Sequence, residues 1–202
     1  MSVLVGAARE RLVAGRRGRI IARWIAGLIN SAGATSALDV GCGDGSIDVL
    51  IQNAVPGLSI HGVDVLQWSH TEIPVEKFDG RRLPFGDNSF DAVIFLDVLH
   101  HTDDPSILLR EAKRVARKAV VLKDHTMSGL CAYQTLRFMD WVGNAHHGVA
   151  LPYNYWSEQQ WYDACASIGF VIELWQSKLN LYPWPVSVAF ERNLHFVALL
   201  GA

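Results

Sequence analysis

Cysteine is scarce in this chain of 202 residues, since only Cys42, Cys131 and Cys165 occur and they lie far apart. An odd number of scattered cysteines argues against a disulfide framework and favours a reducing compartment, so we expect a cytoplasmic protein. No apolar run reaches the roughly 18 residues that indicate a membrane-spanning helix. The amino terminus does not read as a secretory signal, because arginines interrupt every apolar stretch.

Neither sign of charge is in clear excess, because the formal net charge is -2 and 19% of the residues are charged. With 50% hydrophobic residues, this composition is globular, and it excludes a largely disordered chain. The balance gives no reason to expect nucleic-acid binding. Low-complexity segments and internal repeats are also missing, and the length fits one domain, so we expect residues 1–202 to form a single domain.

The amino-terminal segment, residues 1–33, holds the one concentration of charge. Six arginines stand there against the single acid Glu10: Arg9, Arg11, Arg16, Arg17, Arg19 and Arg23. Apolar residues recur at helical spacing over residues 20–29, which predicts a helix from about residue 7 to residue 30 that packs one face on the domain. We interpret the arginine face as a solvated surface. The alternatives are a transit peptide and a surface that contacts phosphates or lipid headgroups.

Short apolar runs then alternate with helical segments. Strands are expected at residues 36–40, 58–65, 74–78, 90–96 and 119–122, with helices at 46–53 and from Pro105 to about Lys118. This alternation predicts a parallel sheet covered on both faces, the α/β class of a Rossmann-like three-layer sandwich. A later helix at residues 157–168 has Ser157 as N-cap and Gly169 as terminator, and strands follow at 170–174 and 195–200.

A glycine-rich turn, residues 41–45 (GCGDG), joins the first expected strand to a helix. Such a turn lets the backbone approach a ligand closely, and the helix offers free N–H groups. Asp64 ends the next strand, where a carboxylate can accept hydrogen bonds from ribose hydroxyls. The G-x-G-x-x-G spacing of dinucleotide sites is not met, and Asp44 would repel a pyrophosphate. The pattern therefore argues against a nicotinamide-dependent oxidoreductase.

Four segments in sequence order resemble class I S-adenosylmethionine-dependent methyltransferases: residues 37–45 (ALDVGCGDG), 61–65 (HGVDV), 78–80 (FDG) and 83–101 (LPFGDNSFDAVIFLDVLHH). The last is similar to the ubiquinone/menaquinone-biosynthesis type of small-molecule methyltransferase. The resemblance covers about residues 35–122. It implies a seven-stranded, mostly parallel sheet with the last strand antiparallel, and methyl transfer from S-adenosyl-L-methionine to a small molecule.

The resemblance also implies a set of cofactor contacts: Gly41 and Gly43 for the methionine part, Asp39 for its amino group, Asp64 for the ribose, Val65, Asp79 and Gly80 for the adenine, and Leu96 beside the sulfonium. Only 15 positions separate Asp64 from Asp79, which is short for a helix of about 11 residues plus a strand. We therefore expect a loop at residues 66–72, leaving the adenine side either open or covered by Trp68.

The acceptor side is expected on loops at the carboxyl ends of the strands, because methyl transfer mainly requires alignment of the nucleophile. Residues 97–101, 123–125 and 144–147 carry five of the eight histidines. We expect a cavity bordered by Asp97, His101, Asp124 and His125, an oxygen or carbon nucleophile, and a histidine as base where a proton must leave. Each of these histidines has a structural alternative as a helix cap or loop contact, and Lys123 is expected to be exposed to solvent.

A metal site is an alternative for these residues, since histidine and aspartate bind zinc and iron. We disfavour it because no helical His-x-x-x-His pair occurs and adjacent histidines rarely point the same way. Residues 124–157 show no clean periodicity and are rich in aromatic residues and histidine, so we expect an irregular insert over the active site, either as a lid or as packing. The alternative function is a catalytically inactive cofactor-binding protein that acts through a protein partner, with the arginine-rich helix or this insert as interface.

Overall fold

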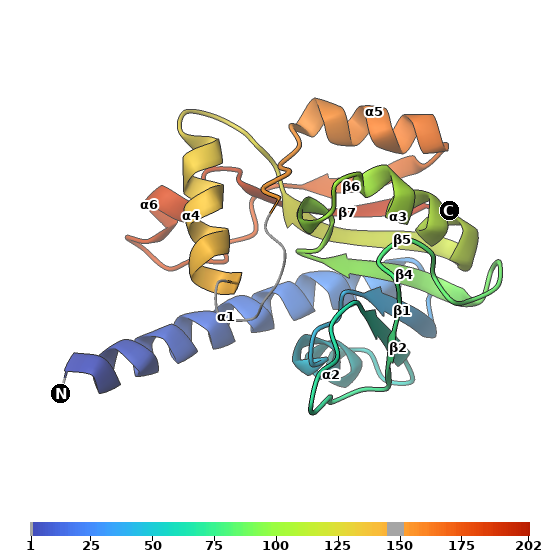
Figure 1. Cartoon of the computed structure of the whole chain (residues 1–202), viewed down its shortest axis with the longest axis horizontal. Coiled ribbons are helices and arrows are strands. Elements are labelled where there is room, and N and C mark those ends of the chain that lie inside the picture. Colours follow the sequence, from blue (N-terminus) through green and yellow to red (C-terminus); the bar gives the residue numbers. More distant parts are fainter. Residues whose placement is uncertain (1, 145–151) are drawn as a thin grey trace.

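The computed structural model describes the backbone of residues 2–144 and 152–202 and the side chains of residues 15–143 and 152–202. Along the chain (Figure 1) the elements are α1 (Ser2–Ser31), β1 (Ser36–Val40), α2 (Ser46–Ala54), β2 (Ser59–Asp64), β3 (Val75–Lys77), β4 (Phe90–Leu96), η1 (Leu99–His101), α3 (Pro105–Val115), β5 (Ala116–His125), α4 (Ala132–Asn144), α5 (Glu158–Ile168), β6 (Val171–Gln176), α6 (Ser187–Phe190) and β7 (His195–Gly201). His146 and His147, expected near the acceptor, lie outside the described residues.

The strands form one seven-stranded sheet in the order β3-β2-β1-β4-β5-β7-β6. The first five are parallel, whereas β7 runs antiparallel to both of its neighbours. The expected Rossmann-like sheet with an antiparallel last strand is therefore confirmed. Since the chain moves outward in opposite directions from β1 and β4, the carboxyl ends of these two strands border the crevice where open α/β sheets bind ligands.

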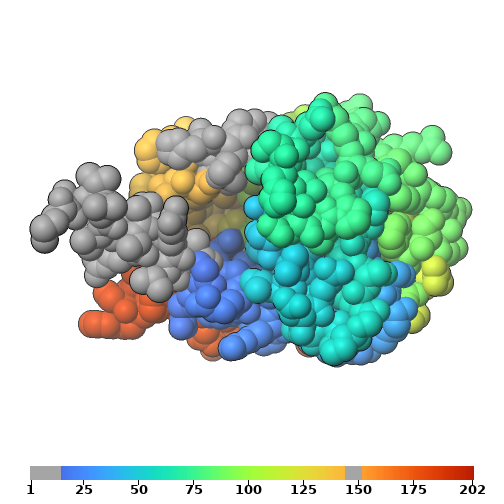
Figure 2. Space-filling view, turned by 90° about the horizontal axis from the view of Figure 1, so that it is seen from below, coloured from blue at the N-terminus to red at the C-terminus, as the bar shows by residue number. Residues whose placement is uncertain are grey.

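Two apolar layers cover the sheet. Helices α1 and α2 lie side by side on one face (Figures 1 and 2), where Ile21, Ile25 and Ile29 of α1 are almost completely buried. Helices α3 and α5 cover the other face. The isoleucines stand four positions apart, so they form one stripe along α1. The opposite side of α1 carries Arg16, Arg19 and Arg23, which are exposed as expected.

The expected helix ends are largely confirmed. Ser157 and Gln160 form a capping box at the start of α5, and Gly169 ends it in the left-handed region with a φ of 84°. Helix α3 differs, because it ends at Val115 and β5 begins directly at Ala116. The residues expected in its last turn are instead in a strand, where Arg117 and Lys118 contact Asp91.

Two expectations for the second half of the chain were wrong. Strand β5 continues to His125, three residues beyond its expected end, because β7 pairs with it along that whole length. Residues 132–144, expected to be irregular, form α4, whose buried side includes Ala132 and Leu136. The loop expected at residues 66–72 is confirmed. Within the residues that the structure describes, no helix is long and apolar enough to cross a membrane.

Candidate active site

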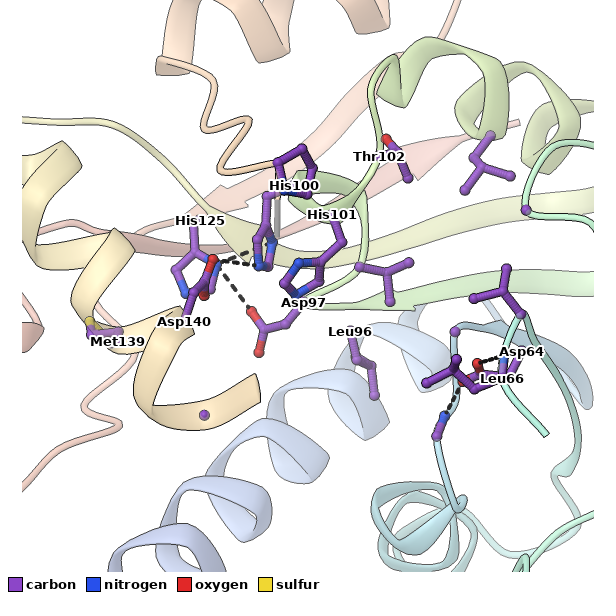
Figure 3. Close-up of a pocket in the computed structure, with 18 of the residues that line it drawn as sticks. Asp64, Leu66, Leu96, Asp97, His100, His101, Thr102, His125, Met139 and Asp140 are labelled. Carbon is purple, nitrogen blue, oxygen red and sulfur yellow. Dashed lines mark hydrogen bonds and ion pairs between the residues drawn. The ribbon is translucent and has the colours of Figure 1, made fainter. Parts of the chain in front are cut away.

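A cavity of about 1210 Å³ opens at the carboxyl ends of β1, β2 and β4 (Figure 3). Ligand pockets of small molecules usually measure roughly 300–1,000 Å³, so this one has room for a nucleoside-sized cofactor together with a small acceptor. Seven of the eight expected cofactor residues line it: Gly41, Gly43, Asp64, Val65, Asp79, Gly80 and Leu96. Three of the four expected acceptor residues do so as well: Asp97, His101 and His125.

The glycine turn requires its glycines, since Gly41, Gly43 and Gly45 all have positive φ. A Cβ atom added at Gly41 would lie 2.6 Å from Val98, which follows β4, so the turn packs tightly against that strand end. At Gly43 the nearest atom would be 3.8 Å away, on Trp68. Gly43 therefore presents open backbone to the cavity, with Trp68 beside it.

Asp64 holds this turn in place. Its Oδ2 accepts a hydrogen bond from the Gly43 N–H at 2.9 Å, and its Oδ1 accepts one from the Leu66 N–H at 2.8 Å. Each oxygen keeps a further lone pair, and the side chain lines the cavity. The carboxylate can therefore fix the turn and accept ligand hydroxyls at the same time.

Another part of the cavity wall is formed by Val65, Asp79 and Gly80. Val65 is 48% exposed, and a Cβ atom at Gly80 would lie 3.1 Å from it, so these two residues adjoin. Asp79 Oδ1 accepts the N–H groups of Arg81 and Arg82, and these hydrogen bonds lower the pKa of Asp79. The result is a shallow, apolar shelf with one ionised carboxylate at its edge.

A layer of carboxyl groups lies beneath the glycine turn. Asp39 and Asp48 are both buried, and Asp39 is not part of the cavity wall that the described residues form. Burial raises the pKa of Asp48 to about 7, and burial together with Asp48 raises that of Asp39 well above its usual range. Burial and the charges of Asp39, Asp48 and Asp64 also raise the pKa of the Cys42 thiol. Protons are therefore retained in this buried layer near neutral pH. Asp48, an acid in the apolar sequence of α2, was missed by sequence reasoning.

Asp97 lies where β4 leaves the sheet and has a φ of 58°, a conformation uncommon outside glycine. Its carboxylate pairs with Arg17 of α1 and Lys123 of β5. Burial alone would raise the pKa of Asp97, but Lys123 and Arg17 hold it well below its usual range. Lys123 was expected to be exposed and is completely buried, because it lies in the extended part of β5, between β4 and β7 in the sheet, with His195 Nδ1 3.4 Å from its Nζ.

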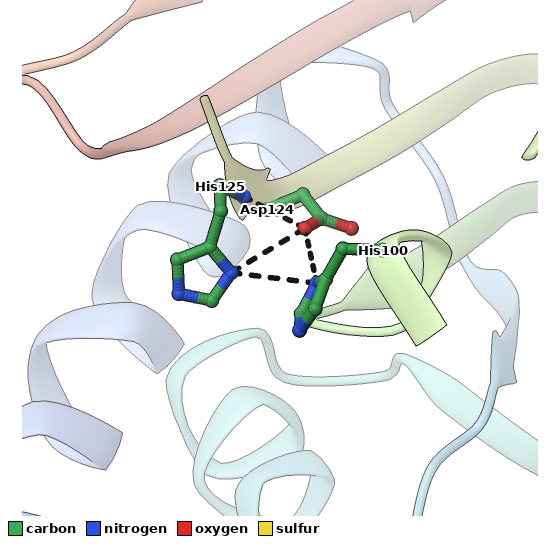
Figure 4. Close-up of side chains that lie close together, drawn as sticks. All are labelled: His100, Asp124 and His125. Atoms are coloured by element: carbon green, nitrogen blue, oxygen red, sulfur yellow. Dashed lines mark hydrogen bonds and ion pairs between the residues drawn. The ribbon is translucent and has the colours of Figure 1, made fainter. Parts of the chain in front are cut away.

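His100 connects the cavity to a buried carboxylate (Figure 4). Its Nδ1 lies 2.5 Å from Asp124 Oδ1, while Asp124 Oδ2 accepts the Leu99 N–H at 3.0 Å. Burial would lower the pKa of His100, but Asp124 and Asp140 outweigh it and raise the pKa to about 10. Asp124 is completely buried and lies outside the cavity wall that the described side chains form. Asp124 therefore affects the cavity only through the residues that it contacts, above all His100.

Three histidine rings converge here. The rings of His100 and His101 lie 4.0 Å apart between centroids, and those of His100 and His125 lie 4.5 Å apart. Burial and the charge of His100 lower the pKa of His101 to about 4, and they also lower that of His125. Adjacent histidines were expected to point apart, which is wrong for this chain, because His100 and His101 of the short helix η1 both line the cavity.

Sequence reasoning missed Arg17 and Asp140 as cavity residues. Arg17 stands four positions before the buried Ile21, and Asp140 stands four positions after the buried Leu136. Each charged residue therefore stands on the buried face of its helix, where an apolar residue is expected. A charged residue at an apolar position is the signal that could have identified it. His100 Nε2 lies 3.4 Å from Asp140 Oδ2, and the Tyr155 hydroxyl donates a hydrogen bond to Asp140.

A family profile described as "Methyltransferase domain" matches residues 38–122. The ubiquinone/menaquinone biosynthesis C-methyltransferase of Desulfotalea psychrophila is 30% identical over 104 residues, 47% of this chain and 42% of that enzyme. The 27-O-demethylrifamycin SV methyltransferase of Amycolatopsis mediterranei is 31% identical over 105 residues, 46% of this chain and 39% of that enzyme. The matches therefore span less than half the length of these curated relatives.

Among solved structures, magnesium protoporphyrin IX methyltransferase from Synechocystis PCC 6803, with bound SAH, has a TM-score of 0.60 at 16% identity. The likeness covers 92% of this chain and 83% of that chain, and it is a likeness of fold. Residues 38–122 are thus similar in sequence to a methyltransferase domain, and the chain has the Rossmann-like fold of the solved S-adenosylmethionine-dependent methyltransferases that it resembles.

Proposed function

We propose that this chain transfers a methyl group from S-adenosyl-L-methionine to a small molecule. The observation that carries the proposal is the open glycine turn at the cavity, which the Asp64 carboxylate fixes by accepting the Gly43 N–H. An acidic site of this kind accepts hydrogen bonds from ribose hydroxyls and an ammonium group, and it offers a pyrophosphate no counter-charge. The cavity volume of about 1210 Å³ leaves space for an acceptor beside the cofactor.

The residues on the donor side fit this cofactor. Gly43 offers open backbone for the methionine part, Asp64 has lone pairs for ribose hydroxyls, and the shelf of Val65 and Gly80 suits an adenine ring. When bound, S-adenosyl-L-methionine supplies a methyl group whose bond to a positively charged sulfur breaks with its electron pair staying on sulfur. Asp39 has a raised pKa and does not reach the cavity wall formed by the described residues, so we assign it a supporting role beneath the turn without direct contact to the cofactor.

On the acceptor side, Asp97, His101 and His125 border the space next to Leu96. We assign the alignment of an oxygen or carbon nucleophile to these three, with Asp124 orienting the His100 ring and accepting the backbone N–H of His125. The nucleophile provides the electron pair of the new bond to carbon. Where it carries a proton, a cavity-lining histidine is placed to accept that proton.

Next to these histidines, α4 and α6 add apolar side chains to the cavity wall: Phe138, Met139 and Val142 from α4 and Phe190 from α6. We infer that this part of the insert, residues 124–157, faces an apolar or aromatic acceptor and keeps water from the transfer. The free cysteines Cys42, Cys131 and Cys165 agree with a reducing compartment, and we propose the cytoplasm.

Calorimetry with S-adenosylmethionine and with its demethylated product tests the donor side, and we expect binding of one molecule of either per chain. Turnover is then measured as release of the demethylated product over a panel of phenols, carboxylic acids and enolisable carbons. Absence of binding would overturn the proposal. Binding without turnover on any acceptor would favour the alternative of an inactive cofactor-binding protein that acts through a partner.

A further inference from the structure

Two histidines and a carboxylate meet on the cavity wall opposite the glycine turn. His100, His101 and Asp140 offer ligand atoms that all lie within 4.8 Å of one another, and all three side chains line the cavity (Figure 3). Imidazole nitrogen and carboxylate oxygen together suit zinc and ferrous iron. We propose that these three residues bind a divalent transition-metal ion, zinc by preference, at the acceptor end of the cavity.

The ring nitrogens that would bind the metal are buried, and among the described residues His100 Nε2 has only the ion-pair contact with Asp140 at 3.4 Å. Neither His100 Nε2 nor His101 Nδ1 has a hydrogen-bond partner within the described part of the chain. His100 is 1% exposed, so its Nε2 does not reach bulk water. Buried polar atoms without partners are rare and costly. A metal ion between them satisfies both nitrogens at once, and the proton that His100 carries without metal is released to solvent when the ion binds.

The separation of two atoms within this set matches that of two ligands on a single ion. His100 Nε2 lies 3.4 Å from Asp140 Oδ2, which is longer than an ordinary nitrogen–oxygen hydrogen bond of about 2.9 Å. Zinc bonds of about 2.0–2.1 Å at tetrahedral angles place two ligand atoms about 3.3 Å apart. The gap is therefore too wide for a good hydrogen bond and close to the width that a shared metal requires.

An outer set of hydrogen bonds already orients these ligands. His100 uses its other nitrogen, Nδ1, on Asp124 at 2.5 Å, and Tyr155 donates to Asp140. A carboxylate behind a ligating histidine fixes the ring and raises its basicity. Asp124 and His125 also lie near His100 (Figure 4), but the Asp124 contact is of hydrogen-bond length and that carboxylate lies outside the described cavity wall. We therefore place Asp124 behind the ligands.

Three protein ligands leave a zinc ion with an open position. Because all three line the cavity, that position faces the space assigned to the acceptor. This consequence rests on the proposed function: an acceptor hydroxyl bound at the metal would lose its proton more readily and attack as an alkoxide or phenolate. The metal site itself does not depend on methyl transfer.

Cobalt(II) is the probe for this site, because it replaces zinc and absorbs visible light when bound in low coordination. Untagged full-length protein is stripped with a chelator and titrated with cobalt, and we expect one ion per chain with a visible absorption band. His101→Ala and Asp140→Asn should lose the band. Asp124→Asn should weaken binding about 10–100-fold. His70→Ala, a change at an exposed histidine outside the cavity, should bind cobalt like the wild type.

A wild-type titration without one-to-one binding or without the band would overturn the proposal, whatever the variants do. So would retention of wild-type affinity in both His101→Ala and Asp140→Asn, with folding checked by circular dichroism. Calorimetry with the demethylated cofactor is run on the same samples. Cobalt binding without cofactor binding would refute the proposed function and leave the metal site, and the reverse result would refute the metal site alone.

Discussion

Asp64 illustrates how one side chain at a strand end serves both fold and site. Its two oxygens accept the N–H groups of Gly43 and Leu66, which joins the glycine turn to the segment that follows β2. The geometry of the turn therefore depends on a charged acceptor that also faces the cavity. Any change that replaces one oxygen by a donor disturbs both functions.

Asp64→Asn should weaken cofactor binding, because the new amide NH₂ group would face a backbone N–H that needs an acceptor. Hydrogen bonds to charged groups contribute about 1.5–3 kcal/mol, so the dissociation constant of the demethylated cofactor should rise about 10–100-fold. Calorimetry measures the change. The matched control is Asp87→Asn, outside the cavity, and equal affinities of the two variants would contradict this role of Asp64.

Asp48→Asn should stabilise the protein, and more so at high pH. Burial raises the pKa of Asp48 to about 7, whereas the unfolded chain titrates near 4. Between these values the folded state keeps a proton that the unfolded state has lost, so wild-type stability falls as pH rises through this window. An amide keeps a donor toward Asp39 and has no such proton to lose.

Thermal melts at pH 5 and pH 8 measure this difference, and we expect a gain in Tm on the order of 5 °C at pH 8 and a smaller gain at pH 5. Asp163→Asn, an exposed change on α5, serves as control. A gain that is the same at both pH values would show that ionisation of Asp48 does not limit stability.

At the scale of helices, neighbouring residues in the sequence fix the ends of α5, whereas contacts with distant residues give α1 and α4 their part in the site. Helix α5 has its ends fixed locally, by the capping box of Ser157 and by Gly169. Helices α1 and α4 instead carry one charged residue each in an otherwise buried stripe, Arg17 and Asp140, and both of these line the cavity. These two helices therefore bring charge into the site as well as packing on the fold.

Ser157→Ala should destabilise the protein by about 1 kcal/mol, as is typical for loss of an N-cap. The hydroxyl accepts the Gln160 N–H at 3.3 Å, and the alanine variant leaves that group unsatisfied at the start of α5. Urea unfolding measures the loss. In the same helix Ser167→Ala should be neutral within about 0.5 kcal/mol, and equal effects of the two changes would argue against the cap.

At the scale of the whole molecule, α1 links the apolar face of the sheet to the acceptor side of the cavity (Figure 1). Its isoleucines pack beneath the strands, while Arg17 pairs with Asp97 at the end of β4. Lys123 holds the same carboxylate from β5. Three distant segments are thus joined at one acidic group beside the predicted methyl-transfer position.

Arg17→Gln should lower both stability and turnover while leaving cofactor affinity within about twofold. Losing one charged hydrogen bond should cost about 1–3 kcal/mol, and Asp97 keeps Lys123 as its partner. Urea unfolding, calorimetry and kcat/KM on the acceptor found in the panel measure the three effects. Arg19→Gln changes an exposed arginine of the same helix. A tenfold loss of cofactor affinity in Arg17→Gln alone would place Arg17 on the donor side instead.

The sequence alone determined most strands, the capped helix α5, the glycine turn and the position of Asp64, because these depend on periodicity and on neighbours close in the chain. Seven of the eight residues that it predicted for cofactor binding line the cavity, and their role stays a prediction. Only the tertiary structure decided the surroundings of the acceptor. Lys123 is buried because pairing with β7 continues β5 as far as His125. Arg17 pairs with Asp97, which lies 80 positions away in the sequence. Whether a charged side chain is solvated or paired depends on partners that folding brings together, and no local pattern encodes that choice.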